Sequence, residues 1–241
     1  MTKLICYLAY GYPSIEESLK VANAYMEAGC DIIEIGLPTH DAFLDNEAVA
    51  SRMNKALENC SDYEVYLDGI LRLKKSSPDM PLILLAYEHT ILDIGLVNFS
   101  QFCSSNELDN LILVGAKDDN MKNKLMTAGI KVSEYVTFKL SEEEVKRAKA
   151  SNGFVYLQSK PMESVWRDEY ETLEKCICYL HNAGIDRPIY CGVGVSTPED
   201  VRRVASAGGD GAFIGSSILK LQGDLNALKA YIIELKSAAE N

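Results

Sequence analysis

The sequence predicts a single α/β domain, spanning residues 1–241, that folds as a closed (β/α)8 barrel, the TIM barrel. Two observations lead to this prediction. Short apolar segments alternate with longer amphipathic segments along the whole chain, and eight of the apolar segments can be counted. The length of 241 residues is also close to the roughly 250 that such a barrel typically needs.

The short apolar segments have the character of strands that are buried on both faces. Several are rich in Ile, Leu and Val, and each is bounded by Gly, Pro, Asp or Asn, which is typical of a parallel sheet covered by helices. The eight expected strands are Leu4–Tyr10, Asp31–Gly36, Pro81–Tyr87, Leu108–Val114, Lys131–Phe138, Gly153–Leu157, Pro188–Cys191 and Gly211–Ile214.

The amphipathic segments are expected to be helices, and three of them carry start signals. Ser14-Ile-Glu-Glu17 and Ser141-Glu-Glu-Glu144 have the spacing of a capping box. Thr197-Pro-Glu-Asp200 combines an N-cap residue, a proline at the first helical position and acids in the first turn. The first helix ends near Gly29, and the others are expected at Val49–Leu57, Tyr63–Lys75, Leu92–Cys103, Asn120–Ala128, Ser141–Ala150, Glu169–Asn182, Pro198–Ala207 and Leu225–Lys236.

Two other architectures are compatible with an unbroken alternation of strands and helices. An open doubly wound sheet usually has about five to seven strands and opens its first helix with G-x-G-x-x-G, which this chain lacks. A division into two small domains would need a boundary, and the chain shows no linker, low-complexity segment or block of like charge. The closed barrel is therefore favoured.

The overall charge argues against nucleic acid and membrane partners. The formal net charge is −11 and the pI is about 4.8, so the surface repels a phosphate backbone. No apolar run approaches the roughly 20 residues of a membrane span, and Met1–Tyr10 is too short for a secretion signal. Any bound phosphate must consequently be held by local backbone amides.

Seven cysteines are scattered along the chain, mostly inside apolar segments. An odd number in such positions indicates reduced core cysteines in a cytoplasmic protein. Cys176 and Cys178 lie two residues apart on an expected helix and so point to different faces, which is unsuitable for a metal site. We expect no metal ion.

The candidate chemistry lies at the carboxyl ends of the strands, where barrels of this class place their active sites. Glu34 stands inside the apolar run Asp31-Ile-Ile-Glu-Ile-Gly-Leu-Pro38 and faces either the helices or the barrel mouth. A buried carboxyl has a raised pKa, as a general acid near neutral pH requires. The alternative is a structural Glu that is hydrogen-bonded to neighbouring amides. The loop that follows adds His40, Asp41, Asp45 and Glu47 at the same end of the barrel.

Two glycine-containing loops follow the seventh and eighth expected strands. They read Cys191-Gly-Val-Gly-Val-Ser196 and Asp210-Gly-Ala-Phe-Ile-Gly-Ser-Ser217. Small residues at these two places let backbone amides approach a phosphate, with the start of a short helix aimed at it. The alternative is that the glycines only make tight turns. Lys220, one helical turn further on, could assist or could be an ordinary surface residue.

These motifs resemble those of the tryptophan synthase alpha chains. Glu34-Ile-Gly-Leu-Pro38 looks like the family's Glu-Leu-Gly-Ile/Val-Pro motif, and Tyr10-Gly-Tyr-Pro13 resembles its Ala-Gly-Asp-Pro turn. Gly192–Glu199 and Gly211–Ser216 match its phosphate loops closely. The similarity extends over nearly the whole chain.

The resemblance implies a lyase that needs no cofactor and acts on a phosphorylated small molecule. The family cleaves indole-3-glycerol phosphate by a retro-aldol reaction to indole and glyceraldehyde 3-phosphate, and it works with a tryptophan synthase beta chain. By resemblance, Glu34 protonates the indole ring and Asp45 holds the indole N–H. The implied substrate-binding residues are Tyr87, Tyr156, Gly194, Gly215 and Ser216.

The chain departs from the family pattern in several loops. Tyr12 replaces an Asp, Ala42 replaces a Pro, and Val114–Lys117 replaces an Asp-x-Pro motif. Residues 158–168 lack the family's Ser-Arg-x-Gly-Val-Thr-Gly, and Trp166 is expected to pack on the barrel rim or a partner. Two alternatives therefore stay open: a divergent paralogue acting on another phosphorylated molecule, and a weakly catalytic regulatory subunit of a partner enzyme.

Overall fold

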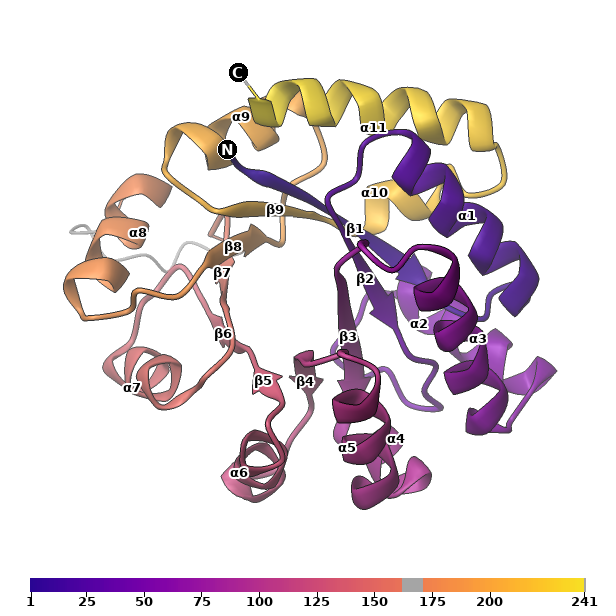
Figure 1. Cartoon of the computed structure of the whole chain (residues 1–241). Coiled ribbons are helices and arrows are strands. Elements are labelled where there is room, and N and C mark those ends of the chain that lie inside the picture. Colours follow the sequence, from indigo (N-terminus) through magenta and orange to yellow (C-terminus); the bar gives the residue numbers. More distant parts are fainter. Residues whose placement is uncertain (162–170, 241) are drawn as a thin grey trace.

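A computed structural model, which describes residues 1–161 and 171–240, shows a ring of parallel strands surrounded by helices (Figure 1). The sheet within these residues has the order β5-β4-β3-β2-β1-β9-β8-β7-β6. The strands are β1 (Lys3–Ala9), β2 (Ile32–Gly36), β3 (Leu82–Tyr87), β4 (Asn110–Val114), β5 (Lys131–Val132), β6 (Glu134–Val136), β7 (Val155–Gln158), β8 (Ile189–Gly192) and β9 (Gly211–Ile214). The predicted (β/α)8 barrel is confirmed.

The fifth expected strand, Lys131–Phe138, is the one whose prediction was wrong in detail. It is divided into β5 and β6, and it ends at Val136. Ser133 marks the division because the backbone changes partner there: the Ser133 amide donates to Leu111 of β4, and the next amide, of Glu134, donates to Phe154 beside β7. One continuous segment thus pairs with both of its neighbours and joins the two edges of the ring.

Most helices occupy the positions that the amphipathic segments predicted. They are α1 (Ile15–Glu27), α2 (Glu47–Asn59), α3 (Tyr63–Ser76), α4 (Glu88–Ile94), α5 (Leu96–Ser105), α6 (Asp119–Thr127), α7 (Glu142–Ala150), α8 (Leu173–Asn182), α9 (Pro198–Ser206), α10 (Ser216–Leu219) and α11 (Leu225–Glu240). The single helix expected at Leu92–Cys103 is two helices, because Gly95 breaks it with a φ of +90°, and the first of them, α4, already begins at Glu88. The helix expected from Glu169 begins at Leu173, after the N-cap Thr172.

The last helix completes the ring. The helix α11 packs against both α1 and α9, so the first and last helices of the chain lie side by side (Figure 1). None of the helices in the described ranges is long and apolar enough to span a membrane. Cys176 is buried and Cys178 is exposed, which confirms that they point to different faces.

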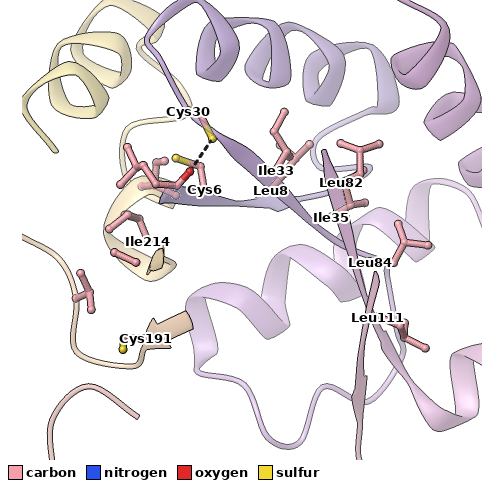
Figure 2. Packing of buried hydrophobic residues seen from close by; sticks show 14 of the residues in the cluster. Cys6, Leu8, Cys30, Ile33, Ile35, Leu82, Leu84, Leu111, Cys191 and Ile214 are labelled. Carbon is pink, nitrogen blue, oxygen red and sulfur yellow. Dashed lines mark hydrogen bonds between the residues drawn. The ribbon is translucent and has the colours of Figure 1, made fainter. Parts of the chain in front are cut away.

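Alternate residues of the strands divide into two buried layers. The outer layer, between the strands and the helices, includes Cys6, Leu8, Ile33, Ile35 and Leu84 (Figure 2). The inner layer fills the barrel with Ile5, Ile83, Phe154, Tyr190 and Phe213. Any polar residue that shares the inner parity therefore points into the barrel.

Candidate active site

Glu34 has the inner parity on β2, because its neighbours Ile33 and Ile35 belong to the outer layer. It is in register with Tyr7 of β1 and with Ile83 of β3, both of which face the interior. The side chain is only 4% exposed. Of the two orientations that the sequence allowed, the structure has the one that faces the barrel interior.

The environment of Glu34 favours its protonated form. Burial, followed by the negative charge of Asp45, raises the pKa of Glu34 from an ordinary 4.5 to about 8. Within the described ranges the carboxyl forms no hydrogen bond or ion pair, which disfavours the interpretation as a structural residue held by neighbouring amides. At neutral pH this group carries a proton that it can donate.

Asp45 is held at the mouth of the barrel by Tyr87, the last residue of β3. The Tyr87 hydroxyl donates to Oδ2 of Asp45 at 2.7 Å and accepts from the amide of Leu44 at 3.2 Å. Burial raises the pKa of Asp45, and the hydrogen bond from Tyr87 opposes that rise. Phe43 packs edge-on against the Tyr87 ring, with centroids 5.5 Å apart. The loop after β2 is thereby fixed over β3.

The other polar residues of this loop do not join the site. His40, Asp41 and Glu47 are exposed, and Glu47 is simply the first residue of α2. Asn46, which the sequence reading passed over, caps α2 through its side-chain oxygen and donates from Nδ2 to the Ser216 hydroxyl at 2.9 Å. It ties the loop after β2 to the loop after β9.

Tyr156, on β7, packs against the inner layer of the barrel. Its ring stacks on Phe213 of β9 with centroids 4.4 Å apart. A Cβ at Gly192 of β8 would collide with this ring, so the glycine makes the room that Tyr156 occupies. Burial, then the charge of Glu34, raises the pKa of Tyr156 well above its usual value, so the phenol stays protonated near neutral pH.

The loops after β8 and β9 present free backbone amides. Val193 and Gly194 both have positive φ, 57° and 96°, which turns the chain sharply at the end of β8. Gly215 ends β9 and immediately precedes the short helix α10, which starts at Ser216. Within the described residues, the amides of Gly194, Gly215 and Ser216 have no acceptor. These are the amides that the sequence singled out for a phosphate.

Asp200, on the first turn of α9, shapes the loop after β8. Its Oδ2 accepts from the amides of Ser196 and Thr197 at 3.0 and 3.1 Å, and the Thr197 side chain accepts from the Asp200 amide, which together make a capping box at the predicted start of this helix. Burial opposes its ionisation, but the ion pair with Lys160 and these amides hold the pKa of Asp200 well below its usual range. The loop is therefore tied to a fixed carboxylate.

Two further residues support the loops and were missed by the sequence reading. Lys160 lies against Gly194 through its aliphatic chain and places its ammonium 2.5 Å from Asp200, so a cation stands beside the loop. Tyr231 of α11 donates to the Ser196 carbonyl at 2.6 Å and lies 2.9 Å from the Ser217 hydroxyl, joining the loops after β8 and β9. Lys220, in contrast, is exposed at the end of α10.

The segment that differs most from the family pattern falls mainly outside the described residues. Ser159 and Lys160 are described, whereas the packing expected for Trp166 concerns a residue outside the described ranges. In those ranges no group of three or more His, Cys, Asp or Glu side chains is placed to hold a metal ion.

Comparison with known proteins identifies the family. A sequence model described as "Tryptophan synthase alpha chain" matches residues 1–240. The chain belongs to the tryptophan synthase alpha chain family. The alpha chain of Aquifex aeolicus is 29% identical over 226 residues, covering 91% of this chain and 86% of that one. The alpha chain of Dehalococcoides mccartyi is 29% identical over 223 residues, covering 90% and 86%.

Solved structures agree with the alpha-chain fold. A structure from Aquifex aeolicus VF5 superposes with a TM-score of 0.86 at 27% identity and covers 98% of this chain and 92% of that one. The tryptophan synthase subunit alpha of Legionella pneumophila gives a TM-score of 0.84 at 21% identity, covers 100% of this chain and 93% of that one, and supports the fold alone. Membership of the alpha-chain family supports a lyase role in tryptophan biosynthesis.

The raised pKa of Glu34 predicts that the stability of this alpha-chain relative depends on pH. The folded state holds the proton more tightly than the unfolded state, so the stabilisation is fully present below about pH 4.5 and is lost as the pH rises to about 8. Glu34→Gln should remove this loss. The free energy of unfolding of Glu34→Gln, relative to that of wild type, should therefore rise by roughly a few kcal/mol between pH 5 and pH 8.

Urea denaturation at several pH values measures this difference. Glu142→Gln, at an exposed position in the first turn of α7, is the matched control and should follow wild type at every pH. Parallel stability curves for Glu34→Gln and wild type would show that Glu34 is not protonated in the folded protein.

Proposed function

We propose that the chain cleaves indole-3-glycerol phosphate to indole and glyceraldehyde 3-phosphate. One observation carries the proposal: Glu34, buried in the barrel with a pKa of about 8, lies below Asp45 at the mouth and below loops whose amides have no acceptor among the described residues. That arrangement supports a proton donor at one end of a ligand and an anion site at the other. The retro-aldol reaction transfers only protons and the electron pair of one C–C bond, so it needs no cofactor.

The proposed roles follow from the positions of the groups. Glu34 donates its proton to C3 of the indole, and Asp45 accepts a hydrogen bond from the indole N–H and stabilises the positive charge that develops on the ring. The bond between C3 and the carbinol carbon then breaks, and its electrons restore the aromatic ring. The carbinol hydroxyl passes its proton to the Glu34 carboxylate, its carbon becomes that of the aldehyde, and Glu34 is restored to its protonated form.

The remaining proposed residues hold the ligand in place. Tyr156 and Tyr87 line the ring pocket, and the amides of Gly194, Gly215 and Ser216 bind the phosphate. Holding both ends of the molecule places C3 against Glu34, which supplies catalysis by orientation as well as by proton transfer. The direct test is incubation with indole-3-glycerol phosphate while indole and glyceraldehyde 3-phosphate are measured; absence of both products would refute the proposed reaction.

The phosphate site gives a prediction with a matched pair of variants. Ser216→Asp places a negative charge at the start of α10, where the phosphate is proposed to lie, whereas Ser216→Asn has the same shape without the charge. Charge repulsion should make the Asp variant bind inorganic phosphate at least about tenfold more weakly than the Asn variant. Calorimetric titration measures both, and equal affinities would place the phosphate elsewhere.

A tryptophan synthase beta chain is the proposed partner. The loop after β2 supports this, because Phe43 is 58% exposed and Leu44 is 66% exposed at the barrel mouth, next to Asp45. Apolar side chains of this size on an active-site loop suit an interface. Co-elution of the chain with a beta chain on gel filtration would support the pairing. A cytoplasmic location is part of the proposal, since the chain has free thiols at Cys6, Cys30, Cys60, Cys103, Cys178 and Cys191.

A different phosphorylated substrate is the second candidate function. It rests on Ser159–Trp166, where the sequence lacks the glycines and the threonine of the family pattern. Such a substrate would bind at the same anion site through its phosphate, and its other end would differ from the indole of indole-3-glycerol phosphate. Phosphate binding without any cleavage of indole-3-glycerol phosphate would favour this candidate, and a beta chain activated without any cleavage would favour a regulatory subunit.

A further inference from the structure

Tyr7 carries a buried hydroxyl that has no hydrogen-bond partner among residues 1–161 and 171–240. The residue lies on β1 with the inner parity, in register with Glu34, and it is 4% exposed. Its hydroxyl oxygen is inaccessible and forms no hydrogen bond within the described ranges. The ring leans along the barrel so that a Cβ at Gly36 would collide with the hydroxyl. The glycine on β2 thus makes room for this group near the carboxyl end of the strand.

Three other buried tyrosines, in contrast, pair their hydroxyls within the fold. Tyr10 donates to the carbonyl of Tyr66, Tyr25 to that of Tyr7, and Tyr87 to Asp45. A buried hydroxyl without a partner destabilises the fold relative to phenylalanine, which fills nearly the same space. An unpaired hydroxyl that faces a binding site therefore indicates that its partner arrives with the ligand.

The order of the strands indicates which part of the proposed ligand lies beside Tyr7. The ring-binding groups Glu34 and Asp45 belong to β2 and the loop after it, and the proposed phosphate amides follow β8 and β9. In the sheet, β1 lies between β2 and β9. A molecule that reaches from Glu34 to Gly215 must cross the inner face of β1. In indole-3-glycerol phosphate the crossing part is the glycerol chain, which carries two hydroxyls.

Tyr7 is suited to donate to that chain. Burial, then the charges of Asp45 and Glu34, raises the pKa of Tyr7 well above its usual value, so the phenol stays protonated and cannot serve as a base. The close approach of the hydroxyl to Gly36 places it on the side of β1 that faces β2. The nearest chain oxygen is then the carbinol attached to the indole ring.

We propose that Tyr7 is a specificity-determining residue whose hydroxyl donates a hydrogen bond to the carbinol oxygen of the glycerol chain. The inference rests on the proposed function and adds a contact to it. A site with a buried donor at this point discriminates against ligands that lack the hydroxyl, because the donor would remain unpaired. Tyr7 thus distinguishes a hydroxylated chain from a plain alkyl chain between the ring and the phosphate.

The test compares Tyr7→Phe with two ligands. For indole-3-glycerol phosphate, kcat/KM should fall about tenfold, the usual effect of one lost hydrogen bond. For indole-3-propanol phosphate, which lacks both chain hydroxyls, the inhibition constant should change by less than about twofold. The Tm of the ligand-free variant should be equal to wild type or higher, since only an unpaired hydroxyl is lost. Tyr190→Phe is the control, because Tyr190 faces the same interior but lies near Asp210.

Three results would overturn the inference. Equal losses for both ligands would mean that Tyr7 only shapes the pocket, and a lower Tm would mean that its hydroxyl has a structural partner. An unchanged kcat/KM would mean that the hydroxyl does not meet the substrate. If wild type neither cleaves indole-3-glycerol phosphate nor binds the propanol analogue, the proposed function fails and the inference fails with it, which separates that outcome from the others.

Discussion

Glu34→Gln should lower the turnover of indole-3-glycerol phosphate by at least about 10²-fold, and by up to about 10⁴-fold. Gln has nearly the same size and shape as a protonated Glu, so the barrel interior should keep its packing. The amide cannot give a proton to C3 of the indole, however, and the reaction then depends on water. Initial rates of indole release at saturating substrate measure the loss in kcat.

Two controls separate catalysis from folding in this experiment. The phosphate affinity of Glu34→Gln should equal that of wild type, because the free amides of Gly194 and Ser216 lie in loops after other strands. Its Tm near neutral pH should be no lower than that of wild type, since wild type holds a titrating carboxyl in an apolar site. Near wild-type turnover would remove Glu34 from the role of acid, and a failure to fold would favour the structural interpretation.

The wild-type pH profile provides an independent check on the same residue. A general acid must be protonated, so the rate should fall on the alkaline side as the pH passes about 8, the pKa of Glu34. The burial of Glu34 could be predicted from the local sequence. It stands between Ile33 and Ile35 in a strand whose two faces are both covered, so either orientation of its side chain is buried. The structure adds the neighbour, Asp45, that raises the pKa further.

Local pattern predicted most of the fold because burial repeats every second residue in a strand and caps mark helix starts. It failed where tertiary pairing decided the outcome. Nothing in Lys131–Phe138 signals that the backbone changes partner at Ser133, since that depends on where β4 and β7 end. Gly95 was a visible signal: a glycine inside an expected helix can end it, and here it has positive φ.

The candidate site could be predicted from the sequence where its residues stand together in one short motif. Glu34 and the glycine loops satisfied that condition, whereas the supporting residues come from distant segments. Asn46 reaches Ser216, and Tyr231 reaches Ser196, across 170 and 35 residues of sequence. Such contacts exist only because the barrel brings the loops after β2, β8 and β9 to the same end. Asp45 could not be told from Asp41 by its surroundings in sequence alone; Tyr87 makes the difference.

Asp45→Asn should lower kcat/KM for indole-3-glycerol phosphate by about 10²- to 10³-fold, the usual effect of removing one fixed group that stabilises developing charge. The Asn side chain can still accept from the Tyr87 hydroxyl, so the loop after β2 should stay in place. What is lost is the negative charge beside the cationic ring. Tyr87→Phe is the companion variant; it keeps the charge and removes the hydrogen bond, and it should cost only about tenfold.

The pH dependence of Asp45→Asn gives a signature that a loss of structure would not produce. The charge of Asp45 helps to raise the pKa of Glu34, so its removal should lower that pKa. Because Glu34 must be protonated to act, the alkaline fall in rate should move to a lower pH than in wild type. Rates measured between pH 6 and pH 9, roughly, would show the shift. An alkaline limb that stays at the wild-type pH would mean that the two carboxyls do not interact and that Asp45 acts on the substrate alone.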